Sequence, residues 1–346
     1  MEKMSAFTNP IIIELWRKDK LVANIRDNQV IDFSEDAPIL IKKGRVNDWK
    51  AIRTQDLNRP NSRALRRLLG LSTSNAQDVL PLIYYQSLSD SFWLKEKGNS
   101  VQWEDIQFSD DRFFTITLTG KGHMSSPEIF NKKESPEHSN TGSFEKGWKL
   151  KNGRWQLWKA GAAEAVWSEV FYSNLANIIF PGSAVKYWED SSFSVCDNFI
   201  DREKGESLEP YYSYCDDHND SKLALTLLPE SVHEDYRNML FLDALMYNWD
   251  RHEFNFGVLT RPGITEARLQ PYFDFNLSLF NGAEPGSIRF EDTTIKMFKQ
   301  VKTNVPLLTK DMIKLAYEKT TTSFPPAASL HETVDFIIQS YAIISS

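Results

Sequence analysis

The sequence predicts an α+β protein in which a β-rich lobe is followed by a helical lobe, with an extra α/β subdomain at the N-terminus. Differences in residue pattern divide the 346 residues into three regions, and these regions indicate this order. Residues 1–105 mix short strands with a helical pair, residues 106–204 hold strands around one helix, and residues 205–346 are mainly helical. Because ligands often bind between lobes, we expect the functional site between the second and third regions.

The N-terminal subdomain is expected to contain short strands and two helices. Asn58–Ser62 begins the first helix, and Ser74 or Asn75 provides the N-cap of the second. The expected elements are, in chain order, strand 11–16, strand 37–43, helix 63–71, helix 76–86 and strand 92–97.

The second region is predicted to be the β-rich lobe. FFTITLTG at 113–120 alternates apolar and polar residues, which is typical of a half-buried strand. Asn152-Gly153 supplies the two positive-φ residues of a type I′ turn inside WKLKNGRWQLWK at 148–159, and this predicts a hairpin. The polar segment 124–142 is expected to be a loop. The remaining elements are helix 162–179, strand 184–188 and strand 193–200.

The third region is predicted to be mainly helical. A helix over 234–248 is apolar enough to be buried, and it runs into the strand-like FGVL. Two late helices, over 309–319 and 329–344, begin at the capping residues Thr309 and Ser329.

Composition excludes several classes of protein. The chain is 41% hydrophobic and 25% charged, so bulk disorder is not expected. It has 40 Lys+Arg against 47 Asp+Glu, and this net charge of −7 argues against a dedicated nucleic-acid binder. The basic segment 45–70 is either a solvated helical face or a local patch for nucleic acid, and we favour the solvated face.

Two further observations concern compartment. Cys196 and Cys215 are the only cysteines, and neither has the spacing of a disulfide scaffold or a zinc site. No apolar run approaches the roughly 20 residues that span a membrane, and the apolar segment near the N-terminus is too short for a signal peptide. We therefore expect a soluble cytoplasmic protein.

The decapeptide NWDRHEFNFG at 248–257 crowds polar residues where a helix meets a buried segment, which is costly unless something satisfies them. Asp274 follows between two phenylalanines. Asn255 and Asp274 could supply the hard oxygen ligands that magnesium prefers, and Asp250 could accept the proton of an attacking hydroxyl. The alternative is structural: Asp–Arg pairing stabilises the end of the helix, and the His252 side chain caps its carbonyl groups.

Lys159 ends the strand RWQLWK and lies ten residues before Glu169, which could pair with it. Such a lysine either reaches solvent or binds an anion. The turn from Asn140 to Gly147 contains two glycines whose backbone N–H groups could face phosphates, although a plain turn is an equal alternative.

The order of these parts is more informative than any one of them. A glycine-containing turn, a strand lysine, a helix glutamate, a connector, a buried helix, Asp-x4-Asn and a later Asp form the order of a protein-kinase fold. The spacings agree, since Lys159 follows Gly142 by 17 residues and Asp274 follows Asp250 by 24.

Three stretches resemble the HipA-like serine/threonine kinases, bacterial proteins of kinase-like fold that are often toxins of toxin–antitoxin pairs. They are SLSDSFWLKEKGNSVQWEDIQF, NTGSFEKGWKLKNGRWQLWKAG, and DALMYNWDRHEFNFGVL with PYFDFNLSL after it. The resemblance covers about residues 85–285, and DRHxxNFG is its most specific part. The metal motif reads Asp-Phe-Asn here rather than Asp-Phe-Gly; asparagine can still adopt a positive φ, so the turn is feasible with Asn276.

The resemblance implies roles for named residues. Asp250 would be the catalytic Asp, Asn255 and Asp274 would hold Mg²⁺, and Lys159, paired with Glu169, would contact the phosphates of ATP. The loop Gly142, Ser143, Phe144, Glu145 and Lys146 would cover those phosphates. Ser143 or Thr141 would be a site of autophosphorylation, and Cys196 and Asn198 would line the adenine pocket.

The resemblance also implies partners. The substrate would be a protein Ser or Thr hydroxyl, in the toxin-like case on a translation component, and an antitoxin protein would be a partner. No membrane or direct nucleic-acid contact is expected. Three alternatives stay open: a nucleotide-binding pseudokinase or scaffold, a kinase-fold enzyme acting on a small-molecule or lipid hydroxyl, and a DNA-associated protein that uses the basic segment 45–70.

Overall fold

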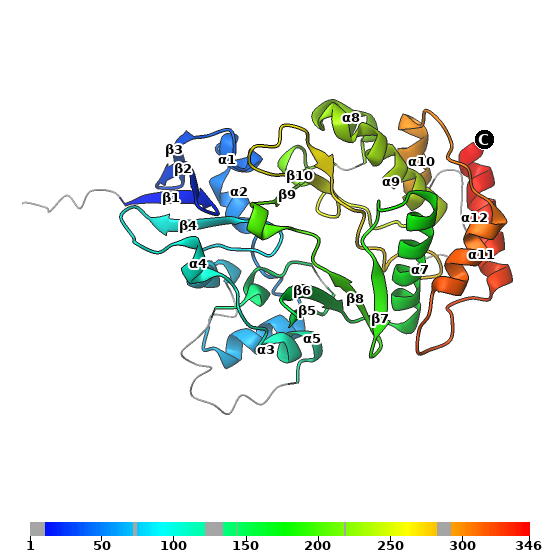
Figure 1. Cartoon of the computed structure of the whole chain (residues 1–346), viewed down its shortest axis with the longest axis horizontal. Coiled ribbons are helices and arrows are strands. Elements are labelled where there is room, and N and C mark those ends of the chain that lie inside the picture. The colour runs from blue at the N-terminus through cyan, green and yellow to red at the C-terminus, as the bar shows by residue number, and fades with distance from the viewer. Residues whose placement is uncertain (1–10, 72–74, 122–133, 143, 218, 282–291) are drawn as a thin grey trace, which may run out of the picture.

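The computed structural model describes residues 11–71, 75–121, 134–142, 144–217, 219–281 and 292–346. It is a mixed α/β structure with three antiparallel sheets (Figure 1). The N-terminal sheet and the C-terminal helices lie at opposite ends of the molecule, and a central sheet lies between them.

The N-terminal sheet has the strand order β3-β2-β1-β4. Its strands are β1 (Ile12–Arg17), β2 (Lys20–Arg26), β3 (Gln29–Phe33) and β4 (Phe92–Glu96). Helices α1 (Ile39–Lys42) and α2 (Val46–Ala51) share its core, where Leu15, Leu40 and Trp49 are buried together. The predicted strands 11–16 and 92–97 are therefore confirmed, and they pair with each other.

The predicted strand 37–43 is wrong, because this segment forms α1. Leu40 and Ile41 are both fully buried, and neighbouring residues of a strand would point to opposite faces. Gly44 follows with a φ of +72° and ends the helical segment. A short apolar run does not by itself distinguish a strand from a buried helix.

The predicted strand 113–120 is also wrong, because it forms helix α5 (Phe114–Thr119). The hydroxyls of Thr117 and Thr119 donate to carbonyls four residues earlier, at 3.0 and 2.8 Å. These bonds satisfy the threonine side chains within the helix, although threonine favours strands. Gly120 ends the helix with a φ of +68°.

The helical pair of the first 105 residues is confirmed in position. It consists of α3 (Pro60–Leu68) and the 3-10 helix η1 (Ala76–Ile83), which contains Pro81. The Asn75 side chain caps η1 by accepting from the Gln77 amide, while Ser74 lies outside the described residues. A short helix α4 (Trp103–Ile106) follows β4.

The basic segment 45–70 is a solvated face only in part, since Arg63 and Arg67 of α3 are exposed. Arg53, Arg59 and Arg66 are buried and donate to carbonyl or carboxylate oxygens inside the protein. On α3 the buried side repeats as Ser62, Leu65, Arg66 and Leu69, which is the spacing of one helix face. The basic side chains of this segment therefore mainly bind to other groups of the same chain.

The central sheet has the order β5-β6-β8-β7. Its strands are β5 (Lys146–Lys151), β6 (Arg154–Lys159), β7 (Tyr187–Asp190) and β8 (Phe193–Asp197). The predicted hairpin is confirmed, with φ of +51° at Asn152 and +75° at Gly153. Helix α7 (Ala163–Ile179), also predicted, packs on the sheet, whereas β7 begins three residues later than the predicted strand at 184.

The C-terminal part is mainly helical, and it shares with α7, β7 and β8 the largest hydrophobic core of the described residues. Its helices are α8 (Ser221–Leu227), α9 (His233–Leu245), α10 (Thr293–Val301), α11 (Lys310–Lys319) and α12 (Leu330–Ser345). The side chains of Thr309 and Ser329 cap α11 and α12 as predicted. A small sheet of order β11-β10-β9 joins this part to the N-terminal sheet region, with β9 (Ser207–Pro210), β10 (Gly257–Thr260) and β11 (Arg268–Leu269).

Within the described ranges, no helix is long and apolar enough to cross a membrane. Cys196 and Cys215 are both free thiols.

Candidate active site

Lys159 lies at the centre of a buried ionic cluster. Its ammonium group donates to Glu169 Oε1 at 2.5 Å and to Asp274 Oδ1 at 2.6 Å. Burial acts to lower the pKa of Lys159, but Asp274 and Glu169 outweigh it and hold the pKa above its usual value. The structure thus brings Lys159 of β6 and Glu169 of α7 together with Asp274, which lies 115 residues after Lys159 in the segment after β11.

Glu169 is held from three sides. Besides Lys159, it accepts from Ser194 Oγ at 2.6 Å and from the Phe275 amide at 3.2 Å. Its side chain is almost fully buried. Glu169 therefore positions Lys159 and links α7 both to β8 and to the segment that carries Asp274.

Asp274 itself has a left-handed backbone, with a φ of +65°. Asn276 could have adopted a positive φ, but it does not; the left-handed residue of the motif is Asp274. Burial acts to raise the pKa of Asp274, but Lys159 and Lys146 hold it well below its usual value, so the carboxylate is ionised. A non-glycine residue in this conformation is uncommon and is found often at functional sites.

Asp250 and Asn255 lie in the loop after α9 and contact each other. The Asn255 side-chain nitrogen donates to the Asp250 carbonyl at 2.9 Å, which leaves the Asn255 side-chain oxygen as the atom for a cation. Burial raises the pKa of Asp250 above its usual value, and the nearby charge of Asp274 adds to this effect. Such a carboxylate is better suited to accept a proton than an exposed one.

Arg251 is the main structural support of this loop, in line with the Asp–Arg pairing that the sequence offered as its structural alternative. It pairs with the buried Asp243 of α9 at 2.8 and 3.0 Å, and it donates to the carbonyls of Asn255 and Phe273. Arg251 therefore fixes the Asp250 loop relative to Asp274. The available signal was Asp243 itself, a single carboxylate inside the apolar run LFLDALM.

The loop 140–146 lies at the start of β5, next to this cluster. Lys146 is opposite Lys159 in the β5–β6 register, so both side chains extend from the same face of the hairpin. Burial lowers the pKa of Lys146 to about 8, against the opposing charge of Asp274. Gly142 has a φ of +92°, and a Cβ there would lie 2.6 Å from Lys146 Nζ, so the lysine extends across the glycine.

Other predicted loop residues have different environments. Phe144 is partly exposed, and Glu145 accepts weakly from the Asn61 amide of α3 at 3.4 Å. Ser143 lies outside the described residues. Thr141 is exposed and lines the cavity beside the site.

A group of N-terminal side chains clamps this loop. Arg59 donates to the carbonyls of Asn140 at 2.9 Å and Phe144 at 3.3 Å, and Gln55 donates to the Glu137 carbonyl at 3.0 Å. The buried Glu137, in the 3-10 helix η2 (Pro136–Ser139), accepts from the Trp148 amide of β5. Residues of the N-terminal part of the chain therefore contribute directly to the shape of the site.

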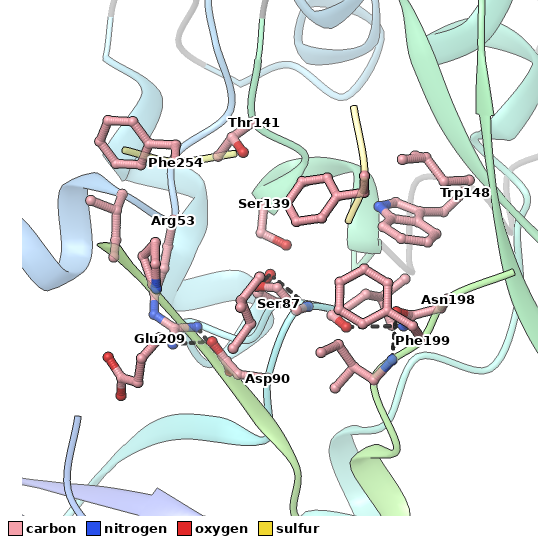
Figure 2. Close-up of a pocket in the computed structure, with 18 of the residues that line it drawn as sticks. Arg53, Ser87, Asp90, Ser139, Thr141, Trp148, Asn198, Phe199, Glu209 and Phe254 are labelled. Carbon is pink, nitrogen blue, oxygen red and sulfur yellow. Dashed lines mark hydrogen bonds and ion pairs between the residues drawn. The ribbon is translucent and has the colours of Figure 1, made fainter. Parts of the chain in front are cut away.

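A cavity of about 210 Å³ runs from the central sheet to the N-terminal sheet region (Figure 2). At one end its walls include Leu157, Val185, Cys196, Phe199 and Phe273. Cys196 is buried, which raises its pKa to about 12 and keeps its thiol protonated. Asn198 lines the cavity but uses its side-chain nitrogen on the Leu88 carbonyl.

The donor set fits a magnesium ion that is shared with phosphates. No group of three or more His, Cys, Asp or Glu side chains that could hold a metal occurs among the described residues. The Asp274 carboxylate and the Asn255 side-chain oxygen are hard ligands, and Mg²⁺ commonly binds one or two such groups together with substrate phosphates.

Comparison with known proteins supports the fold only. No protein-family model matches the chain, and no curated protein matches it. Among solved structures, HipA from Shewanella oneidensis MR-1, in a complex with HipB and operator DNA, is 12% identical with a TM-score of 0.51. The similarity covers 96% of this chain and 95% of HipA, so the two proteins share their fold over nearly the whole length.

The Helicobacter pylori proinflammatory kinase CtkA is similar over a smaller part of the chain. It is 12% identical with a TM-score of 0.41, over 57% of this chain and 89% of CtkA. This likeness is too low to support an argument about fold or activity.

Proposed function

We propose that this chain is an ATP- and magnesium-dependent kinase of HipA-like type that phosphorylates Ser or Thr hydroxyls of a protein. The observation that carries the proposal is the contact of Lys159 with both Glu169 and Asp274, beside the Asp250–Asn255 loop. Phosphoryl transfer depends mostly on positioning and charge neutralisation, and these residues supply both.

Each side chain has a definite task in this proposal. Lys159 and Lys146 bind the phosphates, and Asp250 orients the attacking hydroxyl and accepts its proton. Magnesium, when bound by Asp274 and Asn255, neutralises charge on the transferred phosphoryl group. The cavity end around Leu157 and Phe273 takes the adenine ring, since it is mostly apolar.

The organisation into residues 1–105, 106–204 and 205–346 is part of the same proposal. The first region is an accessory subdomain, the second is the β-rich lobe, and the third is the helical lobe. An antitoxin partner is proposed because the similar HipA was solved with HipB. A translation component as the substrate, and Thr141 or Ser143 as a site of self-phosphorylation, rest on the sequence resemblance.

In the structural alternative, the polar cluster only stabilises the fold and binds no nucleotide. A measurement of nucleotide binding therefore distinguishes this alternative from the proposal. Thermal unfolding of the full chain with Mg·ATP should show a higher Tm than with Mg²⁺ alone, because a ligand of the folded state stabilises it. A Lys159→Met variant should lose this shift. An unchanged Tm of the folded wild type at millimolar Mg·ATP would overturn the proposal.

A further inference from the structure

A second cavity, of about 670 Å³, lies where the N-terminal sheet meets the small sheet that contains β10 (Figure 1). Its walls come from the N-terminal sheet, from α1 and from the loop between β10 and β11. It shares only Glu209 with the cavity described above, so it is a separate site. Its volume is within the roughly 300–1,000 Å³ of common ligand pockets.

Four basic side chains line this cavity, which we call the basic cavity. They are Arg17 at the end of β1, Lys20 at the start of β2, Lys42 at the end of α1 and Arg261 directly after β10. Because Arg261 is far from the other three in the sequence, the fold brings these charges together, and a local run of basic residues does not explain them.

Arg17 is held in the wall of the basic cavity in a fixed orientation. Its side chain is 3% exposed. Its Nε donates to the Gly205 carbonyl at 2.9 Å, and its Nη2 donates to the Thr260 carbonyl at 2.6 Å and to the Thr260 hydroxyl at 2.9 Å. Among the described residues its Nη1 approaches only Asp36, at 4.0 Å, which is beyond hydrogen-bond distance. Arg17 therefore keeps N–H groups for a ligand oxygen.

Arg261 makes no hydrogen bond or ion pair within the described ranges of the chain, and its Nε is buried without an acceptor. Its charge lowers the pKa of Asp201 only from a longer distance than an ion pair. The Ser34 hydroxyl, also in the lining, is likewise buried without a partner in the described structure. Buried polar groups without partners are rare and costly, and the cost is larger for a charged donor. A ligand with several acceptor oxygens would satisfy both groups.

The acidic residues of the lining do not cancel this positive charge. Asp36 already pairs with Lys20 at 2.5 Å. Glu209 is buried, which raises its pKa to about 7, so it is only partly charged near neutral pH. Glu35 is exposed. Three basic side chains therefore remain against one exposed carboxylate.

We propose that the basic cavity binds a small phosphate-bearing anion, with Arg17, Lys42 and Arg261 as the residues that hold it. The planar fork of an arginine matches the geometry of phosphate oxygens, and a lysine adds a point charge. An anion with two or more charges suits three cations better than a monocarboxylate does. The bound anion would connect the N-terminal sheet to the loop after β10. This inference goes beyond the proposed function and does not depend on it.

The test titrates pyrophosphate into the full chain by calorimetry, without Mg²⁺ or nucleotide. We expect Arg261→Met and Lys42→Met each to weaken one binding event about tenfold, as for the loss of a hydrogen bond to a charged group. Arg26→Met and Lys97→Met remove the same charges from exposed positions of the N-terminal sheet region that do not line the cavity. These matched controls should keep the wild-type affinity.

The exposed Lys42 keeps the test decisive, because its replacement leaves the buried contacts of the fold unchanged. No pyrophosphate binding by the folded wild type at millimolar concentration would overturn the inference. Equal weakening by the cavity variants and their controls would also overturn it, because it would show general charge attraction only. Binding that all four variants retain in full would place the anion elsewhere, for example beside Lys159, and would reject the basic cavity. The thermal shift with Mg·ATP tests the proposed function separately.

Discussion

At the scale of single residues, the proposed contact of Lys146 with phosphate should change the protonation of that side chain. Its pKa is lowered to about 8 by burial, and an anion beside it would raise that value. Nucleotide binding should therefore take up a proton near pH 8, and ATP affinity should fall as pH rises from 7 to 9. Calorimetry in buffers of different ionisation enthalpy measures this uptake, and a Lys146→Met variant should abolish it.

Arg251 should be the most sensitive residue for stability. Replacing it by Met leaves Asp243 buried without its charge partner, and breaking such a pair costs about 3–5 kcal/mol. Chemical denaturation should show this loss in the free energy of unfolding. The double variant Arg251→Met/Asp243→Leu should recover part of it, and equal losses in the single and double variants would argue against the pair as the cause.

At the scale of elements, helix α3 should control the order of the loop 140–146. Arg59→Met removes the donors to the Asn140 and Phe144 carbonyls, so amide hydrogen exchange in this loop should accelerate. Arg63→Met, on the exposed side of the same helix, is the matched control and should not change exchange. Identical exchange in both variants would show that the contacts of Arg59 do not hold the loop.

The elements that local chemistry specifies were predictable from the sequence. The hairpin at Asn152-Gly153, the caps Thr309 and Ser329, and helix α7 each depend on residues close together in the chain. Segments 37–43 and 113–120 were predicted as strands and are helices, because their short apolar patterns suit both structures and tertiary packing decides.

The candidate site likewise contains residues that the sequence indicated and residues that it did not indicate. Lys159, Glu169 and Asp274 could be proposed from their order, and the structure places them in contact. The roles of Arg59 and Asp243 could not, because each depends on a contact between distant segments. A buried arginine and a solvated one look alike in a sequence.

At the scale of the whole molecule, two buried carboxyls should make stability depend on pH. Burial raises the pKa of Glu137 and of Glu209 to about 7, above the value of about 4.3 in an unfolded chain. The folded state therefore holds protons that the unfolded state releases, so this stabilisation is complete below about pH 4.3 and is lost as pH rises through 7.

The free energy of unfolding should accordingly decrease between pH 5 and pH 8, by an amount on the order of 3 kcal/mol for each group. Glu137→Gln should flatten part of this slope in denaturation measured across the range. A free energy of unfolding that stays constant or increases toward pH 8 would contradict the prediction that Glu137 and Glu209 are buried in their protonated form.

The most direct test of phosphoryl transfer is incubation of the full chain with ATP and Mg²⁺, followed by intact mass, peptide mapping and measurement of ADP. Asp250→Asn is the control, since it keeps the size of the side chain and removes the proton acceptor. We predict magnesium-dependent ADP formation with a phosphate adduct in the loop 140–146, both lost in the control. Equal ADP formation by the wild type and Asp250→Asn, with no adduct on either, would contradict a kinase that works through Asp250.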